Sequence, residues 1–119
     1  MKEYRDLRVW QEAMNLAETA YGAAGTLPPA ERFGLASQMQ RAAPSIPSNI
    51  AEGNARRSER DFISYLRIAY GSACELQTQA LLSRRMDLGN SDGMGDVIAD
   101  VDSLRKQIAA LIGSLKRAS

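Results

Sequence analysis

The sequence contains no histidine and only one cysteine, and both shortages restrict the chemistry that the protein can perform. Histidine is the commonest general base of enzymes and the commonest neutral metal ligand, so its absence removes most hydrolase and metal-site interpretations. A single cysteine cannot form an intrachain disulfide, and the small and apolar residues around Cys74 favour a buried, inert thiol. We therefore expect a protein that is not an enzyme and that needs no metal and no cofactor.

An excess of one charge and a long apolar segment are also absent. The 15 basic and 14 acidic residues leave a net charge of +1, so any nucleic-acid binding must use a local patch of the surface. No apolar run approaches the ~20 residues that are needed to cross a bilayer. The chain opens with charged residues rather than with the apolar stretch of a secretory signal. We expect no membrane contact and a cytoplasmic location.

Apolar residues at helical spacing predict a first helix over residues 7–24. Steps of three and four residues place them on one face, and Asp6 is positioned to cap the first turn. Two glycines and the pair Pro28 and Pro29 end this helix. The apolar stripe of this helix consists of Leu7, Trp10, Met14, Ala17 and Tyr21.

A second helix is expected to begin near Pro29, since proline suits a first helical turn. Pro44 and Pro47 fall inside its stripe, and each removes one backbone hydrogen bond. We expect a bend or a break near residues 43–47, with Ser45 available to cap a second piece. The presence of Pro44 and Pro47 inside the helix has two possible explanations, a simple proline kink and a binding notch. The stripe consists of Leu35, Met39, Ala42, Ile46, Ile50 and Gly53.

Two further helices are predicted over residues 59–88 and 92–117. The first of them has the clearest heptad pattern, with Ile63, Tyr70 and Leu81 beside its small-residue seam, which predicts more than one contact face. Its stripe consists of Phe62, Leu66, Ala69, Ala73, Leu76, Ala80 and Ser83. The stripe of the last helix consists of Val97, Val101, Leu104, Ile108, Leu111 and Leu115.

Four helices joined by short connections predict an all-α fold, namely an antiparallel up-down-up-down four-helix bundle that forms a single domain over residues 1–119. The second helix is expected to be kinked near Pro44 and Pro47. Dimetal carboxylate centres in such bundles need Glu-x-x-His pairs, which this chain cannot supply. Neither catalytic residues nor metal ligands are therefore assigned.

Two sets of polar residues are candidates for function. Arg56, Arg57 and Arg60, together with Arg41, form the densest basic cluster and are the candidate contacts to nucleic acid, although such a cluster can also be merely solvated. A polar thread runs beside the apolar stripe of the second helix, either as a solvent-facing side or as a network that fixes register. This thread consists of Gln38, Arg41, Ser45, Asn49 and Glu52.

The sequence resembles the bacterial four-helix bundle proteins called 23S rRNA intervening-sequence proteins. The resemblance is carried by residues 45–53 (SIPSNIAEG), by residues 69–76 (AYGSACEL) and by residues 6–10 (DLRVW). The second of these segments adds Ser72 and Glu75 to the expected structural polar residues. Single matching positions in the second helix are Glu31, Gly34, Leu35, Gln38, Arg41 and Ala42.

The resemblance implies a four-helix bundle that can associate, among relatives, into a ring-shaped homopentamer. Some members are encoded within sequences that interrupt the large ribosomal RNA gene. The related accessory variability protein of diversity-generating retroelements assists a reverse transcriptase through a strongly basic barrel. We expect a non-enzymatic, self-associating bundle that binds RNA or a nucleic-acid-binding protein. The alternative is a protein-interaction scaffold with no nucleic-acid role.

Overall fold

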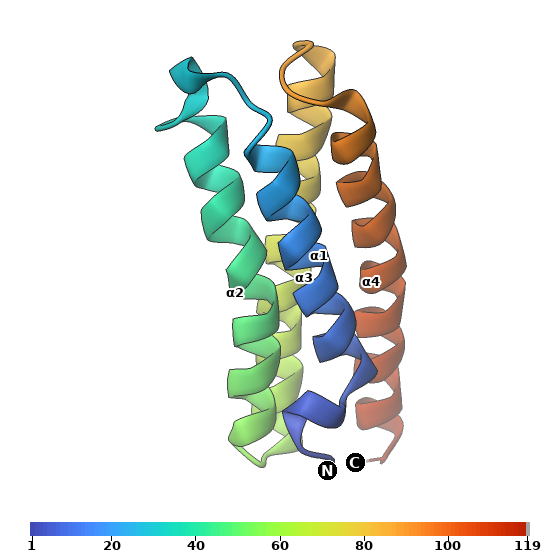
Figure 1. The fold of residues 1–119 in the computed structure, drawn as a ribbon. Coiled ribbons are helices and arrows are strands. Elements are labelled where there is room, and N and C mark those ends of the chain that lie inside the picture. Colours follow the sequence, from blue (N-terminus) through green and yellow to red (C-terminus); the bar gives the residue numbers. More distant parts are fainter. Residues whose placement is uncertain (119) are drawn as a thin grey trace.

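The computed structural model describes residues 1–118, and their regular structure is entirely helical. The long helices are α1 (Arg8–Ala24), α2 (Leu35–Ala55), α3 (Glu59–Arg85) and α4 (Ser91–Ala118). Short 3-10 turns, η1 (Tyr4–Asp6) and η2 (Pro29–Glu31), precede α1 and α2. Figure 1 shows the chain reversing direction at each connection, so that its two ends lie together at one end of the bundle. The predicted all-α, four-helix class is confirmed.

The four helices surround one apolar core in the order of the sequence. Each helix packs against its two neighbours in this order, and α4 closes the circle against α1. No Cα atom of α1 comes within 8 Å of α3, so these two helices occupy opposite corners of the bundle. The predicted stripes of α2 and α3 are buried throughout, whereas Leu111 and Leu115 at the end of α4 are only half-buried.

The apolar stripe predicted for α1 lies on one face of the helix, but this face borders the core rather than filling it. Met14 and Tyr21 are 40% and 49% exposed, and the other three members of the stripe are only partly buried. The face that enters the core instead carries Val9, Ala13, Leu16, Ala20, Ala23 and Ala24. Alanines let α1 lie close to its neighbours, and the larger side chains are left at the surface beside α2. Helix α1 therefore has two apolar faces, of which the core uses the smaller-residue one.

Several helix ends differ from the prediction. Asp6 does not cap α1, because it belongs to η1 and the N-cap residue is Leu7, which provides no side-chain bond. Pro29 begins only a short 3-10 turn, and α2 starts at Leu35, whose N–H donates to Glu31 Oε1 at 3.2 Å. Helix α3 ends at Arg85 rather than at residue 88.

Helix α2 runs through Pro44 and Pro47 as one uninterrupted element. The alternative of a break near residues 43–47 is therefore wrong. The alternative of a bend there stays a prediction. Ser45 does not cap a second piece, because its hydroxyl donates to the carbonyl oxygen of Ala42 within the same helix, at 2.6 Å.

Gly53 in the stripe of α2 marks a point of close approach between α2 and α3. A Cβ atom added at Gly53 would lie 2.5 Å from Cβ of Tyr65 and 3.2 Å from Cδ1 of Phe62, both on α3. Contacts this short are not tolerated, so only glycine allows the two helices their present separation. This explains why an apolar stripe ends on a residue without a side chain.

Candidate functional site

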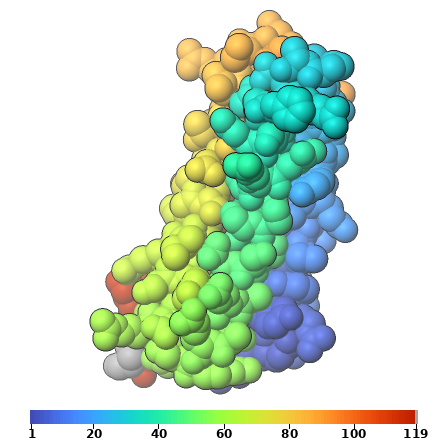
Figure 2. Space-filling model, turned by 90° about the vertical axis from the view of Figure 1, so that its left-hand side faces the viewer, coloured from blue at the N-terminus to red at the C-terminus, as the bar shows by residue number. Residues whose placement is uncertain are grey.

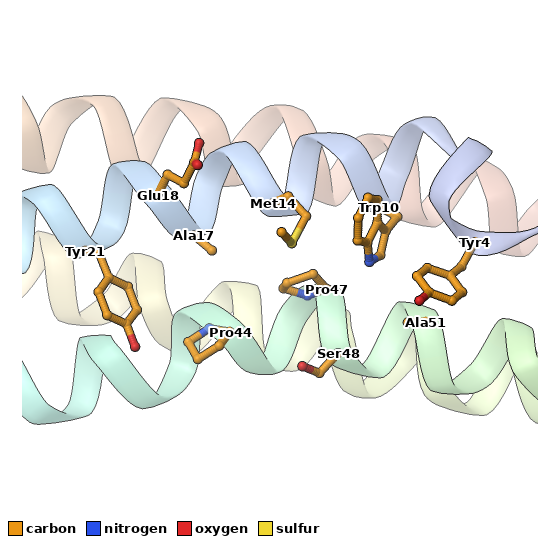
Figure 3. A pocket seen from close by; sticks show the side chains of 10 residues that line it. All are labelled: Tyr4, Trp10, Met14, Ala17, Glu18, Tyr21, Pro44, Pro47, Ser48 and Ala51. Atoms are coloured by element: carbon orange, nitrogen blue, oxygen red, sulfur yellow. The ribbon is translucent and has the colours of Figure 1, made fainter.

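An open groove of about 730 Å³ lies between α1 and α2. Figure 3 shows Trp10, Met14 and Tyr21 of α1 facing Pro44 and Pro47 of α2 across it. The residues that line it are Tyr4, Trp10, Met14, Ala17, Glu18, Tyr21, Pro44, Pro47, Ser48 and Ala51. One wall is thus formed by the apolar stripe that periodicity predicted for α1, and the other wall is the segment around the two prolines.

The groove is apolar and exposed at the same time. Glu18 is the only charged residue among the ten that line it, and it is exposed. The half-buried ring of Pro44 adds to this surface, and the buried ring of Pro47 lies at its floor; both present carbon atoms without a backbone N–H. Apolar surface of this kind on a small protein usually marks a contact site. If Pro44 and Pro47 form a binding notch, a groove must lie beside them, and this groove has both prolines in its lining.

Three of the four candidate arginines gather at the connection between α2 and α3. Arg56, Arg57 and Arg60 lie there, whereas Arg41 precedes Arg56 by 15 residues on α2, which separates them by about 22 Å along the helix. Arg57 has a left-handed backbone (φ 55°), and its Nη1 donates to the carbonyl oxygens of Met1 and Lys2 at 2.9 and 3.4 Å. Arg57 therefore holds the N-terminal segment in place.

Arg56 belongs to a surface triad with Glu52 and Tyr65. Its Nη2 donates to Glu52 Oε2 at 3.0 Å and to the Tyr65 hydroxyl at 2.8 Å, and the Tyr65 hydroxyl donates to Glu52 Oε2 at 3.0 Å. The hydrogen bond from Arg56, followed by that from Tyr65, lowers the pKa of Glu52. The hydrogen bond to Glu52 raises the pKa of Tyr65. The triad ties the end of α2 to α3 and leaves Arg56 partly engaged.

Arg60 lies in a basic hollow that the sequence analysis missed. The hollow measures about 380 Å³, and Arg60, Arg67 and Lys116 line it together with Ser64 and two other residues. Arg60 and Arg67 are seven residues apart on α3, a spacing that the sequence shows. Lys116 comes from the far end of α4, and only the folded chain brings it to this place.

The expected structural polar residues fall into separate groups. Nδ2 of the half-buried Asn49 donates to the carbonyl oxygen of Ser45 at 2.7 Å, close to the two prolines, and the structural role of Asn49 stays a prediction. Gln38, Arg41 and Glu75 line a second groove, of about 550 Å³, between α2 and α3. Within residues 1–118 no hydrogen bond joins these three side chains to one another. Ser72 is half-buried on α3, and Glu52 belongs to the surface triad.

Metal-binding and membrane-spanning features were sought over the same residues. In the described part of the chain, no group of three or more Cys, Asp or Glu side chains could hold a metal ion. None of the helices formed by residues 1–118 has the length and apolar character that crossing a bilayer requires. Cys74 is a free thiol and is half-buried rather than fully buried.

Residues 5–110 match the protein family described as 23S rRNA-intervening sequence protein. The chain belongs to this family. A crystal structure from the S23 ribosomal protein family of Bacteroides thetaiotaomicron VPI-5482, of a protein with unknown function, has a similar fold, with a TM-score of 0.80. The two sequences are 24% identical, and the similarity covers 87% of this chain and 97% of that one. No curated protein matches the chain.

Membership confirms the family resemblance that residues 45–53 and 69–76 carried. Both segments lie inside the matched range, on α2 and α3, and the second groove with Gln38 and Glu75 lies between these helices. The family match stops at residue 110, before the last two turns of α4, and so does not include Lys116 of the basic hollow.

Proposed function

We propose that this member of the family is a non-enzymatic bundle that associates with copies of itself and, once assembled, binds RNA or a nucleic-acid-binding protein. The ring-like form and the number of five subunits come from the family resemblance alone. The observation that carries self-association is the apolar groove between α1 and α2, because nothing in the described chain covers it.

Other exposed apolar side chains support the same proposal. Ile68, Leu81 and Leu82 on α3 are each 45% to 51% exposed, although α3 already contributes a full stripe to the core. A surface with this many apolar side chains is costly in water unless a partner covers it. Contact with identical subunits is the simplest way to supply that partner, since it needs no second gene product.

The groove supports a binding role rather than a catalytic one. A general acid and base must reach the same reacting group, and the groove offers a single carboxylate, Glu18. Apart from Glu18, no lining residue has a side chain that could act as a base toward the hydroxyl groups of Ser48 and the two tyrosines.

RNA binding is supported by the two candidate arginines that remain available. Arg41 and Arg60 form no ion pair and no hydrogen bond with the described residues 1–118, so their guanidinium groups can contact phosphate. One subunit offers too few such contacts for firm binding at physiological salt. Assembly would repeat them along one bound strand, which raises affinity without sequence preference.

Self-association is tested by light scattering and by sedimentation at micromolar protein concentration. We expect a mass that is a multiple of that of the monomer, stable on dilution to the low micromolar range. A strictly monomeric mass would overturn this part of the proposal.

RNA binding is tested with the double variant Arg41→Glu/Arg60→Glu, measured against a single-stranded RNA over a series of salt concentrations. We expect weaker binding and a shallower salt dependence while the assembly stays intact. The control Arg5→Glu/Arg8→Glu changes the net charge equally at two ion-paired arginines near the N-terminus. Equal losses in both variants would show that Arg41 and Arg60 are not the specific contacts, and no wild-type binding at low salt would favour the protein-interaction scaffold.

A further inference from the structure

Helix α3 carries a second exposed stripe on the side that faces away from the core. Ile68 and Leu82 are 51% and 45% exposed, and nothing lies within 4 Å of a Cβ atom added at Gly71. Steps of four and three residues place all members on one helix face. This α3 outer stripe consists of Ser64, Ile68, Gly71, Glu75, Thr78 and Leu82, and all six are exposed.

The groove and the α3 outer stripe lie on different sides of the molecule. Figure 2 shows α2 with α1 (blue) along one side and α3 (yellow-green) along the other. Because α1 and α3 also occupy opposite corners of the bundle, the stripe of one chain cannot reach the groove of the same chain. For the same reason, two copies related by a two-fold axis cannot each place their stripe in the groove of the other at the same time.

The two surfaces are complementary in shape and length. The groove is concave, and the stripe lies on one uninterrupted helix whose small residues, Ser64 and Gly71, let another surface come close. The distance from Ile68 to Leu82 is about 21 Å along α3, and that from Trp10 to Tyr21 is about 17 Å along α1. An amphipathic helix that lays apolar anchors into a groove is a recurrent mode of recognition.

Their polar groups are complementary as well. The one charge of the groove is the carboxylate of Glu18, and beside Ile68 stands Arg67, which forms no ion pair within the described residues. Glu75 in the stripe would need hydrogen-bond donors once covered. The indole N–H of Trp10 and the hydroxyl of Ser48 line the groove, and neither donates a hydrogen bond within residues 1–118.

We infer that the α1–α2 groove of one copy holds the α3 outer stripe of the next copy. This inference rests on the proposed self-association and specifies which two surfaces it uses. The contact is heterologous, because each subunit offers a groove to one neighbour and a stripe to the other. Repeating such a contact gives a closed ring, in which every subunit has both surfaces covered, or an open filament, in which each end subunit keeps one bare surface.

The test uses Met14→Glu, which places a charge in the groove, and Ile68→Glu, which places one in the stripe. Both side chains are 40% to 51% exposed in one chain, so the fold of the monomer should survive. Each variant alone should raise the protein concentration needed for assembly by roughly 100-fold or more, because each leaves every contact with one damaged surface. Ala109→Glu, an exposed position on α4, serves as the matched control and should assemble like wild type.

Mixing the two variants gives the decisive measurement. The intact groove of the Ile68→Glu chain can hold the intact stripe of the Met14→Glu chain, so a 1:1 mixture should form a heterodimer and nothing larger. Should either glutamate variant lose helical circular dichroism at room temperature, Met14→Gln and Ile68→Gln replace them in the same experiment.

Other outcomes overturn the inference. If only Met14→Glu dissociates, the groove meets a surface other than the stripe. If neither variant dissociates, or if the mixture stays monomeric, self-association survives but uses different surfaces. A monomeric wild type would remove the proposed self-association itself and this inference with it.

Discussion

The hydroxyl group of Tyr21 on α1 donates a hydrogen bond to the carbonyl oxygen of Gln40 on α2, at 3.2 Å. In a regular helix this carbonyl would receive the N–H of the residue four positions later, which here is Pro44 and has none. Helix α1 therefore supplies the donor that the sequence of α2 omits. The bond also places the Tyr21 ring at one end of the apolar groove.

Tyr21→Phe should lower the free energy of unfolding by about 0.5 to 1.5 kcal/mol, since it removes the donor but keeps the ring. The exposure of Tyr21 favours the lower part of this range, because water can replace the lost bond. Urea unfolding followed by circular dichroism at fixed protein concentration measures the change. Tyr4→Phe is the control, because the Tyr4 hydroxyl makes no hydrogen bond in the described chain. Equal effects of the two substitutions would argue against the role of the Gln40 bond.

Gly53→Ala should destabilise the protein by about 1 to 3 kcal/mol, because the added methyl group collides with the Tyr65 side chain at the α2–α3 contact. Gly22→Ala provides the contrast on α1, where an added Cβ meets nothing within 4 Å. Alanine should there stabilise the helix by about 0.5 to 1 kcal/mol. The melting temperatures of both variants measure these changes in stability. A Gly53→Ala protein as stable as wild type would mean that α2 and α3 can separate without cost.

Asn49→Leu should destabilise by about 1 to 3 kcal/mol, the cost of losing the side-chain bond at a half-buried position. The acceptor of this bond is the carbonyl of Ser45, and not one of the two carbonyls that Pro44 and Pro47 leave without their helical donors. Asn15→Leu, at an exposed position of α1, is the matched control and should change stability little. An unchanged melting temperature for Asn49→Leu would assign Asn49 to surface recognition instead.

The Glu52 triad predicts a dependence of stability on pH. Because Arg56 and Tyr65 lower the pKa of Glu52 in the folded chain, its ionised form favours folding. Its contribution is therefore full above the ordinary carboxyl pKa of about 4.3, and it is lost as the pH falls through the lowered folded pKa.

Wild type should accordingly melt at a higher temperature than Glu52→Gln at neutral pH, and the difference should vanish in acid. In an Arg56→Gln background the same Glu52→Gln substitution should show a much weaker pH dependence, because the first cause of the lowered pKa is gone. A pH-independent difference between wild type and Glu52→Gln would contradict the ionic role of the triad.

The basic side chains of the candidate site could be predicted only in part from the sequence. The sequence identified Arg56, Arg57 and Arg60 as a cluster because they are close along the chain, and the structure keeps them together. It included Arg41, which lies far along α2, and it missed Arg67 and Lys116, which join Arg60 in one hollow. Proximity between α3 and the end of α4 is a property of packing and cannot be read from spacing within one segment.

The sequence by itself determined the four helices, the buried stripes of α2 and α3, and the family, because hydrophobic periodicity and the segment SIPSNIAEG are local properties of the chain. Only the tertiary structure decided which face of α1 enters the core. Two apolar faces compete in that helix, and the one with Ala13 and Ala20 was buried because small side chains permit close helix packing. The larger Trp10, Met14 and Tyr21 were thereby left to form the groove beside Pro44 and Pro47.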